Sequence, residues 1–196
     1  NFSHSEKLHL FIQDVINEGG ITISNLEAIA VSKGPGSFTG LRIGVSAAKG
    51  LCFALDLPLI AINTLNLMVQ PFFNKKFFDF FIPMLDARRM EVYTSIFNKK
   101  HNIIMQTTAL ILKQDSFLSQ VGSGKCLIIG NGASKFQTLN PKIQTHFNNE
   151  IHYPSAEDMS LLAWEKFSNK DFEALESFEP YYLKDFQTTS SKDIEP

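Results

Sequence analysis

The sequence has 196 residues, 44% of them hydrophobic and 19% charged, which suits a globular protein of one large domain or two lobes. Its formal net charge of -2 argues against a protein that grips nucleic acid by itself. The two cysteines, Cys52 and Cys126, lie in apolar segments and form no CxxC pair, which excludes a disulfide framework. No run of 18 apolar residues and no signal peptide is recognisable, so we expect a cytoplasmic protein without a membrane partner.

The chain opens with a predicted helix. Ser3 and Glu6 have the spacing of a capping box, in which each side chain bonds the backbone N–H of the other residue. Gly19 and Gly20 end the helix. Between these signals, apolar residues recur along one helical face: Leu8, Phe11, Ile12, Val15 and Ile16.

A predicted strand over residues 26–31 runs into a glycine-rich turn over 34–40, and a helix over 39–55 follows. This order of elements is common where an anion binds a helix N-terminus. The turn lacks the Lys of a P-loop, and its glycines are spaced one residue too far apart for a dinucleotide fingerprint. Tight packing is therefore the favoured role of the turn, and anion binding is the alternative. The candidate anion-binding residues here are Gly34, Gly36, Ser37, Thr39 and Gly40.

The helix over 39–55 carries small side chains on one face, at Gly44, Ala47, Ala48 and Gly50. Small side chains let a second helix approach closely, because the distance between helix axes depends on the side chains at the contact. The residues alone favour packing inside this chain, and an interface with a partner is the alternative.

The rest of the chain alternates strands and helices, which indicates an α/β fold. Strands are predicted over 59–62, 80–85, 91–97, 103–105 and 127–129, and helices over 64–69, 115–120 and 155–167. The three central strands form a meander that starts near Pro83 and marks a second lobe. The expected divisions are therefore an N-terminal lobe over 1–82, a C-terminal lobe over 83–186 and a polar tail over 187–196.

Further candidates for chemistry are few. Asp86 ends a predicted strand beside two arginines, and Gly130 and Gly132 form a second glycine turn, so these three residues are candidate nucleotide ligands. More often, an Asp in this position caps a turn. No two of the five histidines stand at i, i+4 and no HExxH is present, so no metal site is predicted. No GxSxG elbow surrounds a serine, and no catalytic residue is assigned.

The stretch from Lys33 to Gly50, KGPGSFTGLRIGVSAAKG, closely resembles the TsaB (YeaZ) family. Further matches lie at 4–6, 58–64, 84–89, 91–93 and 180–183, and they cover most of the chain in the family's order. The resemblance implies an actin-like (ASKHA, ribonuclease H-like) fold of two related lobes. In that family a strand hairpin with a phosphate loop precedes the first helix, and we expect that segment to be missing here.

The resemblance also implies a role in making N6-threonylcarbamoyladenosine on tRNA. In that family TsaB is the non-catalytic, activating partner of the transferase TsaD, TsaE joins the complex, and tRNA is reached only through the complex. TsaB alone should form a homodimer. The first two helices would bind TsaD through Leu8, Phe11, Ile12, Val15, Gly44, Val45, Ala47, Ala48 and Leu51. No cofactor is expected, apart from weak ATP or ADP binding with the partner.

One comparison separates TsaB from its catalytic relative. TsaD carries an HxxxH metal pair where this sequence has Thr64 and Met68, and neither residue replaces imidazole as a ligand of a hard metal. The sequence therefore favours a scaffold over a catalyst. A nucleotide-dependent actin-like kinase or ATPase is the alternative, although Ala87 stands where a second phosphate loop tends to have Gly. A metalloprotease, suggested by the older label "glycoprotease", ranks last because zinc ligands are lacking.

Overall fold

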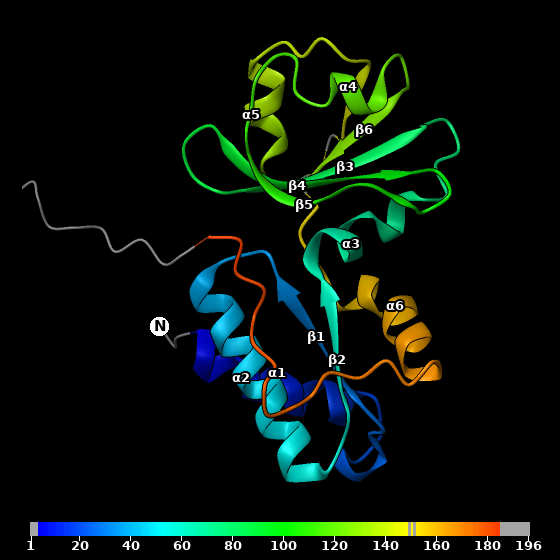
Figure 1. Cartoon of the computed structure of the whole chain (residues 1–196). Helices are drawn as coiled ribbons and strands as arrows, with labels where there is room; N and C mark the ends of the chain where they lie inside the picture. Colours follow the sequence, from blue (N-terminus) through cyan, green and yellow to red (C-terminus); the bar gives the residue numbers. More distant parts are fainter. Residues whose placement is uncertain (1–3, 149, 151, 185–196) are drawn as a thin grey trace, which may run out of the picture.

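The computed structural model describes residues 4–148, 150 and 152–184, which form two lobes joined end to end (Figure 1). In chain order the elements are α1 (His4–Glu18), η1 (Ile23–Asn25), β1 (Ile29–Gly34), α2 (Phe38–Leu55), β2 (Leu59–Asn63), α3 (Thr64–Val69), η2 (Gln70–Phe72), β3 (Phe80–Asp86), β4 (Glu91–Asn98), β5 (Ile103–Ile111), α4 (Leu118–Val121), β6 (Cys126–Ile129), α5 (Ala133–Thr138), β7 (Thr145–Phe147) and α6 (Ala156–Ser168). The predicted cap at Ser3 and the polar tail over 187–196 lie outside the described residues.

The first lobe is built around β1 and β2, which pair in parallel. Side chains alternate along β2: Leu59 and Ala61 pack with α2, and Ile60 and Ile62 pack with α6. The strand is therefore buried on both faces, which explains why its sequence is a continuous apolar run and not an alternating one. In Figure 1, α2 and α6 lie on opposite sides of the two strands.

The second lobe holds a mixed sheet with the strand order β5-β4-β3-β6-β7. Ile82 and Met84 of β3 face a core that includes Phe136 of α5, while Phe81 and Leu85 face a second core formed largely by α3 and η2. Because α3 packs under this sheet, it lies between the two lobes (Figure 1).

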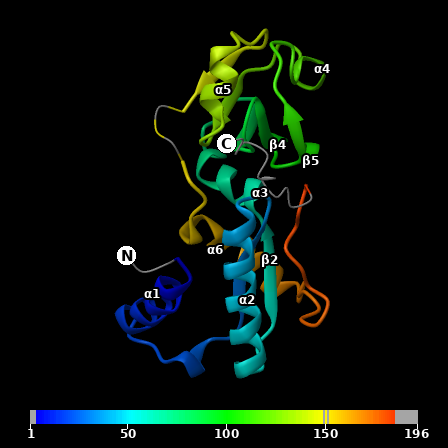
Figure 2. The ribbon, with the colours of Figure 1, turned by 90° about the vertical axis from the view of Figure 1, so that its left-hand side faces the viewer.

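The chain returns to the first lobe after the second sheet. α6 packs against β2, and residues 173–184, which we call the return segment, run back along α2 (Figure 2). The return segment is held by a backbone bridge to Leu59 and by the Lys49 ammonium, which donates to the Phe178 carbonyl at 2.9 Å. The division predicted after residue 82 falls inside β3, and the predicted C-terminal lobe includes segments that pack on the first lobe. The boundary between the lobes therefore does not fall at residue 82, and α6 and the return segment belong with the first lobe.

Most predicted elements are confirmed, with shifted ends. β1 starts at Ile29 and continues to Gly34, whereas the prediction was 26–31. β5 extends to Ile111, well past the predicted Met105, because it pairs with β4 along its whole length. The short strand β7 was not predicted, since Thr145–Phe147 has no apolar run and gains strand structure only by pairing with β6.

By length and composition α2 could cross a membrane, which the sequence analysis did not anticipate. It has 18 residues and a mean hydropathy of 1.2. Its buried face packs on β1 and β2, and its Lys49 bonds the return segment. Only 22% of the helix is buried, and such a helix is weak evidence for a membrane span.

Both thiols are shielded from reagents. Cys52 on α2 and Cys126 on β6 are buried and free. Burial raises the pKa of both thiols, and for Cys126 burial together with the nearby Asp79 carboxylate raises it to about 12. At pH 8 a thiol with that pKa is thiolate in only about one molecule in 10⁴.

We therefore expect iodoacetamide to leave Cys52 and Cys126 unmodified in the native protein and to label both in urea. Intact-protein mass spectrometry measures the added mass. Labelling of either thiol in the native protein at the rate of a free cysteine would contradict the buried positions.

Candidate functional site

Helix α1 buries only one edge of its apolar face. Ile16 is buried and Ile12 is half-buried, but Phe11 and Val15 remain 58% and 68% exposed. Leu10, on another side of the helix, is also exposed. Large apolar side chains that stay exposed together commonly mark an interaction surface.

Helix α2 divides its residues between the lobe's core and the surface. Val45 and Ala48 are 3% and 5% exposed and pack against β2 and Phe178, and a side chain at Gly44 would point at Val31 of β1. Val45 and Ala48 therefore serve the protein's own core and leave almost no surface for the predicted partner contact, whereas Gly44 is half-buried and its partner contact stays a prediction. The wrong assignment arose because a small residue invites close packing equally by a strand or by a partner helix.

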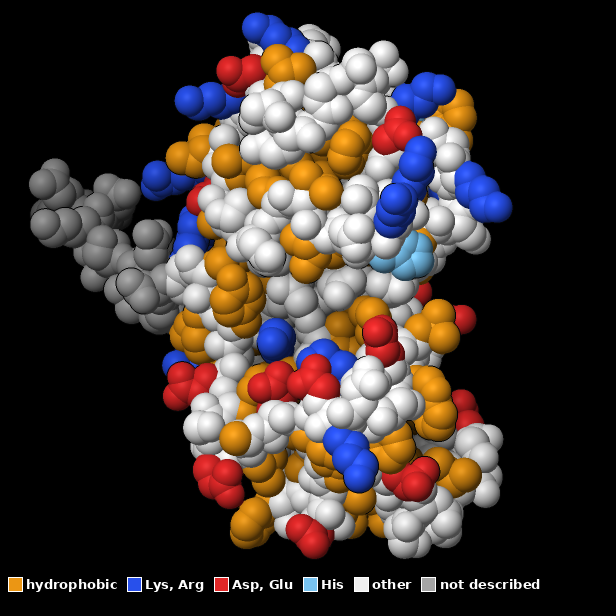
Figure 3. Space-filling model, turned by 45° about the vertical axis from the view of Figure 1, so that its right-hand side comes forward, with side chains coloured by type: hydrophobic (Ala, Val, Ile, Leu, Met, Phe, Trp, Pro, Cys, Tyr) orange, Lys and Arg blue, Asp and Glu red, His pale blue; other side chains and the backbone are white. Residues whose placement is uncertain are grey.

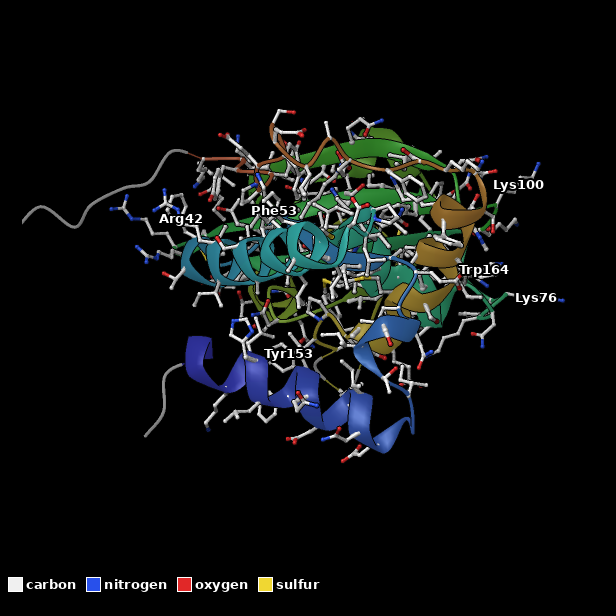
Figure 4. The ribbon with its side chains drawn as sticks, turned by 90° about the horizontal axis from the view of Figure 1, so that it is seen from below. Arg42, Phe53, Lys76, Lys100, Tyr153 and Trp164 are labelled. Carbon is white, nitrogen blue, oxygen red and sulfur yellow. The ribbon has the colours of Figure 1, made fainter. Side chains whose placement is uncertain are left out.

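A groove of about 610 Å³ separates α1 from the outer side of α2. It is lined by His9, Arg42, Ile43, Ser46, Ala47, Gly50 and Leu51. Figures 2 and 4 show α1 standing away from α2 over most of its length. A side chain at Gly50 would meet no atom within 4 Å, so this side of α2 is open to an approaching helix.

One surface residue was missed by the sequence analysis. Phe53 of α2 is 84% exposed. The buried residues of this helix are Leu41, Val45, Ala48 and Cys52, which recur at spacings of three and four. Phe53 falls off that pattern, so helical phase could have identified it as an apolar residue facing outward.

The first glycine turn is a packing feature. Gly34 has φ +114°, and a Cβ there would lie 2.7 Å from the Tyr181 carbonyl oxygen of the return segment. Ser37 caps α2, because its hydroxyl accepts a hydrogen bond from the Gly40 N–H at 3.4 Å. Gly36 lies against Leu41. These contacts explain the turn without an anion, and the exposed Thr39 adds no contact that selects one.

The second glycine turn is also closely packed. A Cβ at Gly130, where φ is +100°, would lie 2.5 Å from the Met84 carbonyl oxygen and 2.6 Å from Cε of Met68. A Cβ at Gly132 would lie 2.7 Å from Val92. In the part of the chain that the structure describes, no hydrogen bond or ion pair joins this turn to residues 34–40. The assignment of the two glycine turns and Asp86 to one nucleotide site therefore stays a prediction.

Asp86 is engaged within its own lobe. Its Oδ1 lies 2.6 Å from Nζ of Lys135 and accepts a hydrogen bond from the Arg88 N–H at 2.7 Å, while its own N–H donates to Asn131. Partial burial alone would raise the pKa of this carboxyl group, but the Lys135 ammonium and the Arg88 N–H outweigh burial and hold the pKa below its ordinary value. The carboxylate thus ties the β3–β4 turn to α5.

We expect Asp86→Asn to lower the free energy of unfolding by no more than about 1 kcal/mol at neutral pH, because the Asp86 side chain is 42% exposed and solvent screens its ion pair. The pKa of Asp86 is lowered by folding, so its contribution is present above the unfolded pKa and is lost as pH falls through the folded pKa. Urea unfolding of both proteins at neutral and at acidic pH measures this. A difference that grows on acidification would contradict the ion pair.

Thr64 and Met68, the positions where the resemblance implies a metal pair in the catalytic relative, lie inside the protein. The Thr64 hydroxyl is 2.6 Å from Oγ of Ser32, and Met68 is fully buried under the second sheet. A hydroxyl already hydrogen-bonded and a thioether form a poor donor set for a hard cation. Among the described residues no group of three or more His, Cys, Asp or Glu side chains could hold a metal ion.

Comparison with known proteins decides the family. A family model described as "TsaD: tRNA N6-adenosine threonylcarbamoyltransferase" matches residues 2–189. The Escherichia coli protein named tRNA threonylcarbamoyladenosine biosynthesis protein TsaB is 31% identical over 186 residues, which are 92% of this chain and 80% of that protein. The chain belongs to the TsaB (YeaZ) family. A TsaB from Haemophilus influenzae is 28% identical and covers 93% of this chain and 80% of its own length.

A solved structure and a transferase sequence provide two further comparisons. A crystal structure of an uncharacterized Pseudomonas aeruginosa protein, described as similar to the peptidase YeaZ, superposes with a TM-score of 0.81 at 24% identity. It covers 93% of this chain and 85% of that chain, which confirms the predicted actin-like fold. A tRNA N6-adenosine threonylcarbamoyltransferase from a Ruegeria species is 46% identical, but over only 63 residues, or 17% of its length. Similarity to TsaB extends along the chain, whereas similarity to that transferase is local.

Proposed function

We propose that this chain is a non-catalytic subunit that binds and activates a TsaD-type transferase in the biosynthesis of threonylcarbamoyladenosine on tRNA in the cytoplasm. The names of the TsaB relatives give the pathway, and the family model carries the name of the transferase. In this proposal the chain forms a homodimer when alone, TsaE joins the larger complex, and tRNA is engaged only there.

The observation that carries the proposal is the unpartnered apolar surface of the first two helices. Phe11 and Val15 of α1 and Phe53 of α2 are more than half exposed. The groove between the two helices is open beside the small residues Ala47 and Gly50 of α2. An exposed apolar surface next to small side chains suits close packing by helices of another protein. We propose that the transferase fills this groove and that a second copy does so in its absence.

Contacts inside the protein favour a scaffold over an enzyme. Thr64 and Met68 replace the metal ligands of the catalytic relative and are enclosed by core contacts. Gly34 and Gly130 support close packing of the backbone, which weakens the alternative of an actin-like kinase or ATPase. We propose that the isolated chain needs no cofactor, and that ATP or ADP binds weakly and only with the partner. The metalloprotease hypothesis gains no support, because no group of three or more His, Cys, Asp or Glu side chains that could hold a metal is present in residues 4–148, 150 and 152–184.

Reconstitution tests the proposal. TsaD, the enzyme that makes its threonylcarbamoyl-adenylate substrate, and unmodified tRNA are combined with and without this chain, and mass spectrometry of nucleosides measures threonylcarbamoyladenosine. We expect modification to depend on this chain and TsaD to co-purify with it. Full modification without the chain would overturn the activating role. Calorimetry with ATP and Mg²⁺ tests the kinase or ATPase alternative, because tight binding and turnover by the isolated chain would support it.

A further inference from the structure

The turn between β3 and β4 presents two arginines to solvent. Arg88 and Arg89 have φ of +68° and +45°, the left-handed conformation that costs an ordinary residue roughly 1–2 kcal/mol. Both residues are exposed. Neither guanidinium has a hydrogen bond or ion pair among the described residues. The turn therefore holds two unneutralised charges side by side.

A third arginine, Arg42 of α2, lies beside the end of the return segment. Phe38 and Tyr182 stack with ring centroids 4.5 Å apart, and the Arg42 guanidinium lies 4.3 Å from the centre of the Phe38 ring. Nε of Arg42 also donates to the Tyr182 hydroxyl at 3.4 Å. The guanidinium is thus oriented by aromatic rings, and no carboxylate pairs with it among the described residues.

Contacts join the two sets of arginines. Lys184, two residues after Tyr182, forms an ion pair with Glu91 at the start of β4. The Glu91 N–H donates to the Arg88 carbonyl oxygen at 3.1 Å, so the return segment ends beside the arginine turn. Two carboxylates near these arginines in the described part of the chain are paired, Glu91 with Lys184 and Asp86 with Lys135. Arg42, Arg88 and Arg89, which we call the arginine face, are left as net positive charge on a chain whose formal charge is -2.

We propose that the arginine face contacts the sugar–phosphate backbone of the tRNA when this chain is in its transferase complex, an inference that rests on the proposed function. Guanidinium groups match phosphate geometry through paired N–H donors and also stack on aromatic rings. RNA-binding surfaces combine these two features. The proposal does not require the isolated chain to bind RNA tightly, since three arginines give a small electrostatic contribution compared with a dedicated nucleic-acid-binding protein.

The arginine turn, Arg88 and Arg89, lies outside the proposed TsaD surface. Of the arginine face only Arg42 is shared with the groove between α1 and α2, whose other lining residues are mainly small or apolar. Figure 3 shows Lys and Arg side chains on both sides of the upper lobe. Arg88 and Arg89 belong to the upper lobe, so substituting them leaves the proposed TsaD surface intact.

The test compares Arg88→Gln/Arg89→Gln with a matched control, Lys76→Gln/Lys100→Gln. Lys76 and Lys100 are exposed and lie on the opposite side of the molecule from Arg42 (Figure 4), so the control makes the same change in net charge elsewhere. Fluorescence anisotropy of a labelled tRNA transcript measures its Kd for the TsaD complex over a series of KCl concentrations. We expect the Arg variant to bind roughly 10-fold more weakly, with a salt slope lower by about 1–2, because each lost phosphate contact reduces counterion release. The control should bind within about twofold of the wild type.

Capture of TsaD, measured on the same proteins, separates this proposal from the proposed function. Undiminished tRNA affinity of the Arg variant, or an equal loss in the control, would overturn the arginine face. Lost capture of TsaD by the Arg variant would also overturn it, because the turn would then belong to a protein interface. If the wild type itself fails to capture TsaD, the proposed function fails. The tRNA affinities of the isolated wild type, Arg variant and Lys control are then compared at low salt, and a loss confined to the Arg variant supports the arginine face, whereas equal affinities overturn it.

Discussion

Gly50→Arg should abolish capture of TsaD without loss of stability. Gly50 is exposed on α2, and a side chain there meets nothing within 4 Å in the free protein, so Arg is accommodated until a partner helix occupies the groove. Arg favours a helix interior over Gly by up to about 1 kcal/mol, so the melting temperature should stay the same or rise. Affinity-tag capture of TsaD and a thermal melt measure the two effects.

Gly50→Ala is the matched control for this variant. It gives a similar gain in helix propensity with little bulk, so it should raise the melting temperature and leave capture largely intact. Capture by Gly50→Arg at wild-type level would show that the partner does not use this side of α2. Arg at Ala48 does not test the interface, because Ala48 packs against β2 and Phe178 and the variant would disrupt the lobe's core.

Gly130→Ala should destabilise the protein more than Gly50→Ala or Gly122→Ala. A Cβ at Gly130 would lie 2.5 Å from the Met84 carbonyl oxygen, and the φ of +100° is strained for any other residue. Neither the strand β3 backbone nor the neighbouring turn can move without disturbing the sheet. We expect the free energy of unfolding to fall by about 3 kcal/mol, measured by urea denaturation.

Gly122→Ala separates the backbone strain from the clash. Gly122 also has a positive φ, +53°, but a Cβ there meets nothing within 4 Å, so it should cost only about 1 kcal/mol. Equal losses for the two variants would show that the close approach of Gly130 to Met84 contributes little. If Gly130→Ala were as stable as the wild type, the second glycine turn would need another explanation, and a ligand-binding role would return.

Local patterns predicted most of the helices and strands. The run over 59–62 reports burial directly, because a strand buried on both faces is continuously apolar. β7 and the extension of β5 could not be found in this way. They depend on hydrogen bonds to β6 and β4, which are partners distant in the sequence.

For the candidate site, the sequence alone determined the family resemblance, the absence of imidazole at Thr64 and Met68, and the apolar faces of the first two helices, since these depend on residue identity and local spacing. Only the tertiary structure decided how those faces are used. It placed Ala48 in the core and left Gly50 open, and it set Gly34 against the return segment, from a part of the chain about 140 residues away. A glycine or alanine allows any neighbour to approach closely because its side chain is small. Which distant segment fills that space depends on the fold.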